Sequence, residues 1–256
     1  TCALPILPQL YTKTSYSLLK STLTIEEYVL AAKKRGYSAI AITDENVLYG
    51  AVEFFNACKK YQMTGIIGLE LDFTFEESIE KIVFYGKNVA GYQELMRLSS
   101  TRMMSEKPLS LADYNIDAKN LISVLPVDNL YDPSEAVFSQ IADLINGEFY
   151  LGISSKTKTS ELSESWPKIA LHEVACLETE QAFAIKIMGH IQNGTQLPRE
   201  ELTNQLGDNY LMEMGKLIAG FEDKQALANA QHLAEVCQFD LPLHQKLLPH
   251  YPVPNQ

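Results

Sequence analysis

Three acidic side chains stand where predicted strands end, and they are the first candidates for chemistry in this sequence. Asp44 and Glu45 follow an apolar run at residues 38–43, and Glu70 lies inside a second run at residues 64–75. In folds built on parallel strands, functional side chains gather at the carboxyl ends of the strands. Carboxylate oxygens are ligands for hard cations. We therefore expect the functional site at this edge of the predicted sheet.

Other catalytic patterns are missing from the sequence. It contains no nucleophile elbow, P-loop or GxGxxG motif, which removes the usual acyl-transfer and nucleotide-binding functions. No two histidines share an HxH or HxxxH spacing, so polar or capping roles are expected for His172, His190, His232, His244 and His250. His172 and Cys176 are four residues apart, but they flank a predicted strand end, where this spacing gives them no common face.

The elements that would position these acids alternate between helix and strand. Thr24 and Glu27 have the spacing of a capping box, which opens an amphipathic helix that ends at Gly36. Strands are predicted at residues 38–43, 64–75, 81–85, 120–125, 148–153 and 168–172. Further helices are predicted at residues 48–61, 89–102, 133–145, 178–191, 210–219 and 223–236. This order predicts an α/β fold with a mostly parallel sheet, either closed into a barrel or open and doubly wound.

Composition limits the classes of partner. The 256 residues are 46% hydrophobic and 21% charged, enough for one sizeable domain with a substantial core. A net charge of −11 and no cluster of basic residues predict that the domain does not bind nucleic acid strongly. Four widely spaced cysteines, no secretory leader and no apolar run near the ~20 residues of a membrane span predict a soluble, cytoplasmic protein.

A family resemblance rests on several short motifs in a fixed order. They are YSLL at 16–19, AITD at 41–44, LYGAVEF at 48–54, IIGLE at 66–70, KNVAGY at 87–92, NYLM at 209–212 and LLPHYPVP at 247–254. Together they resemble the PHP domains of bacterial DNA polymerase III alpha subunits. The resemblance implies a distorted (β/α)7 barrel with extra helices near the C-terminus. It also implies a PHP domain over residues 1–240 and an extended linker over residues 241–256 that leads to a polymerase palm domain.

The resemblance also implies where metal ligands would lie. In this family, histidines and carboxylates hold up to three metal ions at the barrel mouth, and active members use them on phosphoesters. The opening His-x-His of the family falls on Tyr11 and Lys13, and a nearby acid falls on Lys20. A lysine ammonium group has no lone pair with which to bind a metal. The resemblance therefore implies that these three ligand positions have been lost.

The later ligand positions are partly retained. The Asp-His pair of the family reads Asp44-Glu45, and Glu70 matches the glutamate of the family. The histidine of the next strand falls on Lys81, and the later Asp-x-His motif begins at Glu173. We therefore expect a vestigial site that holds no metal or other cofactor and has no catalytic residue.

A charge network is one interpretation of the substitutions. Lys13, Lys20 and Lys81 could supply the positive charge that metal ions once supplied, paired with Asp44, Glu45, Glu70 or Glu173. The alternative is that the lysines reach solvent.

Three functions remain open from the sequence. The parent protein would be a DNA-directed DNA polymerase, a nucleotidyltransferase, whose catalytic carboxylates lie outside this chain. The chain would then be a structural base for the palm and thumb domains and, by analogy, a docking surface for a proofreading exonuclease subunit. A second possibility is an active phosphoesterase or 3'-5' exonuclease in which the four acids hold one cation. The third is a free-standing protein-binding module.

Overall fold

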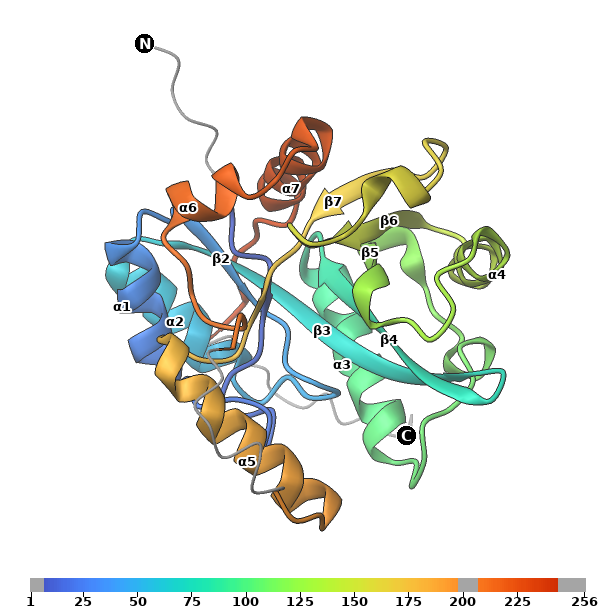
Figure 1. Cartoon of the computed structure of the whole chain (residues 1–256), viewed down its shortest axis with the longest axis horizontal. Coiled ribbons are helices and arrows are strands. Elements are labelled where there is room, and N and C mark those ends of the chain that lie inside the picture. The colour runs from blue at the N-terminus through green and yellow to red at the C-terminus, as the bar shows by residue number, and fades with distance from the viewer. Residues whose placement is uncertain (1–6, 198–206, 244–256) are drawn as a thin grey trace, which may run out of the picture.

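The computed structural model describes residues 7–197 and 207–243, and in them the strands form a curled sheet surrounded by helices (Figure 1). Six strands form one sheet in the order β2-β3-β4-β5-β6-β7. Their bounds are β2 Ala39–Ile42, β3 Thr64–Phe75, β4 Ser78–Gly86, β5 Leu121–Pro126, β6 Glu148–Ile153 and β7 Lys168–Ala170. The expected α/β architecture is confirmed.

A short strand pair connects the two edges of this sheet. β1 (Tyr11–Thr12) pairs in parallel with β8 (Glu173–Val174), which follows β7 in the chain. The segment around β1 also bonds to the β2 segment, because the Thr43 amide donates to the Thr12 carbonyl at 2.8 Å. The strands therefore run around a distorted barrel, as the resemblance implied.

The sheet is mostly parallel, as predicted, but one part of it is antiparallel. β2–β3, β5–β6 and β6–β7 are parallel, whereas β4 is antiparallel to both β3 and β5. The reason is the connection between β3 and β4, which is only two residues long and has Glu76 at a φ of 53°. A connection of this length makes a hairpin, since a parallel crossover needs a dozen or more residues.

Helices cover the outside of the strands, and most of them bury an apolar stripe. The helices are α1 Ile25–Lys34, α2 Ala51–Tyr61, α3 Val89–Met103, α4 Glu135–Ile145, α5 Ala182–Asn193, α6 Met214–Ala219 and α7 Lys224–Val236. α1, for example, buries Ile25, Tyr28, Val29 and Ala32, the face that its spacing predicted. No helix within the described ranges is long and apolar enough to cross a membrane.

Two details of the helix predictions differ from the structure. The Thr24 hydroxyl donates to the Glu27 carboxylate at 2.6 Å and makes no bond to the backbone at the helix start, so the reciprocal capping box does not form. α6 begins at Met214 rather than at residue 210, because Tyr210 forms an isolated β-bridge with Cys176. Of the predicted linker, residues 244–256 lie outside the described part of the chain.

The edge at which β1 and β2 end, beside the middle of β3, carries unusually polar buried residues. Among them are Lys13, Thr14, Ser17, Asp44 and Glu70, each less than a tenth exposed. Buried charges need partners. These buried polar residues therefore make this edge the candidate functional site.

Candidate functional site

Glu70 is the centre of the site, and both of its carboxylate oxygens are occupied. It lies on β3 and is fully buried. One oxygen accepts a hydrogen bond from the Tyr11 hydroxyl and lies 3.2 Å from the Lys13 ammonium group. The other lies 3.0 Å from the ammonium group of Lys81. Three of the predicted site residues therefore meet on this one carboxylate.

The two lysines extend these contacts to two further acids. The Lys13 ammonium group lies 2.6 Å from the Glu173 carboxylate, and the Lys81 ammonium group lies 2.8 Å from that of Glu45. We call the alternating chain Glu173, Lys13, Glu70, Lys81 and Glu45 the ion-pair network. It joins side chains from β3, β4 and β8 with Lys13, which directly follows β1, and Glu45, which lies three residues after β2.

Backbone geometry explains why these side chains converge. Tyr11 and Lys13 are two residues apart at β1, and alternate residues of a strand point to the same face. Lys81 pairs across the hairpin with Asp72, so Glu70 lies on its diagonal and on the same face. The hairpin that breaks the parallel sheet is therefore also the element that brings Lys81 to Glu70.

The network holds Glu70 and Lys13 in their charged forms. Burial works against the charge of Glu70, but the ammonium groups of Lys13 and Lys81 hold its pKa below the usual value. Burial also works against the charge of Lys13, yet Glu70 and Glu173 raise its pKa above the usual range. Burial, followed by the charge of Glu70, raises the pKa of Tyr11 well above its ordinary value. At neutral pH Lys13 is therefore an ammonium group, Glu70 a carboxylate and Tyr11 a neutral phenol.

Asp44 is stabilised in a different way. Its carboxylate accepts hydrogen bonds from the Thr14 amide at 2.7 Å, the Thr14 hydroxyl at 2.8 Å and the Ser17 hydroxyl at 2.6 Å. Burial raises its pKa despite these bonds. Among the described residues, Asp44 forms no ion pair with a lysine. Lys20 likewise forms no ion pair with an acid. Of the ion pairs expected from the sequence, those of Lys13 and Lys81 form, and none forms at Lys20 or Asp44 among the described residues.

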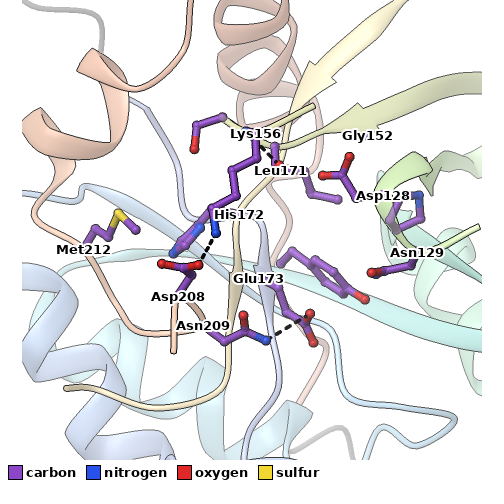
Figure 2. Close-up of a pocket in the computed structure, with 14 residues that line it drawn as sticks. Asp128, Asn129, Gly152, Lys156, Leu171, His172, Glu173, Asp208, Asn209 and Met212 are labelled. Atoms are coloured by element: carbon purple, nitrogen blue, oxygen red, sulfur yellow. Dashed lines mark hydrogen bonds and ion pairs between the residues drawn. The ribbon is translucent and has the colours of Figure 1, made fainter. Parts of the chain in front are cut away.

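A cavity of about 190 Å³ opens beside the network (Figure 2). Glu173 belongs to both, since its second oxygen accepts from the Asn209 side-chain amide at 3.3 Å. Lys156 and Asp208 form an ion pair at the cavity. The sequence prediction missed this polar group. Its only signals were the polar loop that contains Lys156 and the motif that begins at Asn209.

His172 and the cysteines do not belong to the ion-pair network. His172 lines the cavity and its Nε2 atom lies 2.9 Å from the Tyr210 carbonyl oxygen, whereas the Cys176 thiol is directed to the Asn209 carbonyl. Cys58, Cys176 and Cys237 are buried free thiols. Cys2, His244 and His250 lie outside the described residues.

The arrangement does not fit the metal cluster that the resemblance implied for active members. In residues 7–197 and 207–243, no group of three or more His, Cys, Asp and Glu side chains is placed to hold a metal ion. Two of the central positions carry ammonium groups, which cannot donate a lone pair and repel a cation. Glu70, the most buried acid, already has both oxygens bound by protein groups.

Comparisons with known proteins give a consistent result. The profile of a family described as the PHP domain matches residues 9–156. The DNA polymerase III subunit alpha of Bacillus subtilis is 30% identical over 270 residues, which cover 94% of this chain and 24% of that protein. The Staphylococcus epidermidis subunit is 31% identical over 248 residues, which cover 94% of this chain and 22% of that protein. This chain thus spans about a quarter of the length of these relatives.

A solved structure is also loosely similar. It is an amidohydrolase from Chromobacterium violaceum, 14% identical, with a TM-score of 0.45 over 83% of this chain and 96% of that chain.

Proposed function

This chain belongs to the PHP domain family, and from that premise we propose that it is a structural PHP domain of a bacterial DNA polymerase III alpha subunit rather than a metal-dependent hydrolase. The parent protein would act in DNA replication as a DNA-directed DNA polymerase in the cytoplasm. Its polymerase chemistry would take place in domains outside this chain.

The observation that carries the proposal is the pair of lysines bound to Glu70. An active site of this family needs neutral nitrogen and carboxylate ligands around its metals. Here the ammonium groups of Lys13 and Lys81 lie 3.2 and 3.0 Å from the two oxygens of that buried carboxylate. They provide the positive charge that keeps Glu70 ionised inside the protein. The ion-pair network therefore supports folding in the place where metals would support catalysis.

Apolar residues that are partly or fully exposed on one helix support a role in domain packing. α5 lies in the described part of the chain and has no buried residue, although it carries Phe183, Ile187 and Ile191 at a helical spacing of four. In Figure 1 it extends away from the sheet. Relatives of this chain are about four times as long, so most of their mass lies outside the matched region. We propose that palm and thumb domains of the same polypeptide cover α5, with residues 241–256 as the linker toward them.

Amide hydrogen exchange can test the packing role. In a longer polypeptide that contains this chain followed by the polymerase domains, exchange in α5 should slow relative to the 256-residue chain. Equal exchange rates in both proteins would contradict the proposed contact. Docking of a proofreading exonuclease subunit is a further proposal by analogy.

Elemental analysis and a hydrolysis assay test the absence of metal chemistry. After mild dialysis, the purified chain should contain far less than one equivalent of zinc, manganese or iron, and it should not hydrolyse a nitrophenyl phosphodiester or the 3' end of single-stranded DNA. An equivalent or more of metal, together with hydrolysis that a chelator abolishes, would instead establish an active phosphoesterase or exonuclease. In that case Asp44, Glu45, Glu70 and Glu173 would be the candidate ligands.

A further inference from the structure

The cavity beside the ion-pair network contains more negative than positive charge. Asp128, Glu173 and Asp208 line it, and the single basic residue in its lining that is charged at neutral pH is Lys156. Asp208 is paired with Lys156, and one oxygen of Glu173 is paired with Lys13. Lys13 also neutralises Glu70, so its charge is shared between two acids. The lining therefore retains uncompensated negative charge.

Asp128 contributes most directly to this excess. One of its oxygens accepts a hydrogen bond from the Thr157 hydroxyl at 2.7 Å. No lysine, arginine or histidine in the described part of the chain forms an ion pair with it. Because it is exposed at the cavity rim, its charge is available to a bound group without distortion of the core.

The imidazole of His172 adds a hydrogen-bond acceptor. Its Nε2 atom lies 2.9 Å from the Tyr210 carbonyl oxygen, which can only accept a hydrogen bond. The proton of the neutral ring is therefore assigned to Nε2, which leaves the lone pair on Nδ1. Burial lowers the pKa of His172, so the ring is neutral at pH 7. The residues that line the cavity thus carry acceptors of three kinds, namely carboxylates, an imidazole nitrogen and the side-chain amide oxygens of Asn129 and Asn209.

The acceptors are spread around the cavity. Figure 2 shows Asp128 and Asn129 on one side, Asp208 and Met212 on the other, and Glu173 between them. The volume of about 190 Å³ exceeds the ~30 Å³ that one water molecule takes in the liquid. A cationic group larger than a single ion, with several hydrogen-bond donors in different directions, would complement this lining.

We propose that this cavity is a binding site for an alkylguanidinium group. A guanidinium ion is planar, keeps its charge at all physiological pH values and has five N–H donors when it carries one alkyl chain. Leu171, Pro126 and Met212 give the cavity apolar surface for the methylene groups of that chain. The group could come from a free small molecule or from an arginine side chain of a partner protein. The proposal does not depend on the polymerase role proposed above.

Binding can be tested by titration of the ¹⁵N-labelled chain, followed by NMR, at ~150 mM salt to suppress non-specific attraction. N-butylguanidinium is the probe, and the neutral isostere butylurea is the matched control. We expect saturable shifts in the side-chain amide signals of Asn129 and Asn209 with the cation and none with butylurea. Equal shifts from the two compounds, or no saturable shift, would overturn the proposal.

A charge-matched pair of variants assigns the site. Asp128→Asn should weaken N-butylguanidinium binding by about fivefold, the upper range for one exposed ion pair. Asp132→Asn removes the same charge from an exposed residue that does not line the cavity, and it should leave the affinity unchanged. Equal effects of the two substitutions would mean that net charge, rather than this cavity, attracts the cation.

Two further titrations distinguish an arginine side chain, a free small molecule and a metal ion as the ligand. An acetyl-Gly-Arg-Gly-amide peptide that binds more tightly than N-butylguanidinium supports an arginine side chain as the source, and weaker binding of the peptide supports a free small molecule. Competition by millimolar Mg²⁺ or Mn²⁺ at a stoichiometry of one would indicate a metal site and overturn the proposal. None of these results depends on the dialysis and hydrolysis measurements, so the two proposals can fail separately.

Discussion

Glu70 lies inside β3 and Asp44 just after the neighbouring strand β2, and the protein stabilises these two buried carboxylates by different means. Glu70 is held by two ammonium groups and a phenol, and Asp44 by two hydroxyl groups and a backbone amide. The pKa of Glu70 is lowered even though burial opposes its charge, whereas burial raises the pKa of Asp44. Full charges thus outweigh the cost of desolvation at Glu70, and dipoles alone do not at Asp44.

The difference shows which part of the site depends on full charges and which on hydrogen bonds. Lysines occupy positions around Glu70 that the family resemblance assigns to histidine, and both contact its carboxylate. Around Asp44, the loop of residues 14–17 supplies neutral donors. We expect the Glu70 region to respond strongly to the loss of one cation, and the Asp44 region to respond to the loss of hydrogen bonds.

The largest effect is expected from Lys13→Met. The substitution keeps the length of the side chain but removes a cation from a buried carboxylate, and breaking such a pair costs about 3 kcal/mol. Urea unfolding at pH 8 should show this loss, partly recovered when Glu70→Gln is added, since the stranded charge is then removed. Lys156→Met is the control, because Lys156 is in an exposed ion pair and should change stability by about 0.5 kcal/mol.

A smaller loss is expected from Ser17→Ala in the Asp44 region. The Ser17 hydroxyl donates to Asp44 and accepts from the Glu45 amide, so the substitution leaves both groups without that partner. A hydrogen bond to a charged group contributes about 2 kcal/mol. Ser165→Ala, at an exposed serine, should be close to neutral in the same urea titration. A Ser17→Ala protein as stable as that control would mean that Asp44 does not depend on this hydroxyl.

The contributions of the two carboxylates to the pH dependence of stability should have opposite signs. The pKa of Glu70 is lowered in the folded state, so its stabilising contribution is complete above its unfolded pKa and is lost as the pH falls through its folded pKa. The pKa of Asp44 is raised, so its contribution has the opposite sign and stability falls as it ionises. Between about pH 3 and pH 6, Glu70→Gln should flatten the rise of unfolding free energy with pH, and Asp44→Asn should steepen it. Changes in the same direction would show that the two sites do not differ as described.

The smallest effect is expected from Lys20→Met. Lys20 aligns with a family ligand position but forms no ion pair within the described ranges. We expect a change of about 0.5 kcal/mol or less in urea unfolding, with no coupling to Asp44→Asn. A loss comparable to that of Lys13→Met would place Lys20 in the network after all.

Local patterns in the sequence were sufficient to predict the helices and strands. The strand at residues 64–75 was predicted with the bounds that β3 has, and the ends of the predicted helices agree with those in the structure to within four residues. These features follow from the spacing of apolar residues along one segment. The prediction that Asp44, Glu45 and Glu70 lie close together also followed from this spacing. In the structure Asp44 and Glu45 follow β2, and Glu70 lies inside the neighbouring strand β3, bridged to Glu45.

The tertiary structure alone decided which groups contact one another. The β3–β4 hairpin sets the register that brings Lys81 to Glu70. Lys20, by contrast, forms no ion pair with any acid in the described ranges. The cavity combines Asp128, Lys156, His172 and Asp208, which lie in four separate segments of the chain. Ion pairs and cavities depend on distances between such segments, and those distances follow from the packing of the whole chain rather than from any local sequence pattern.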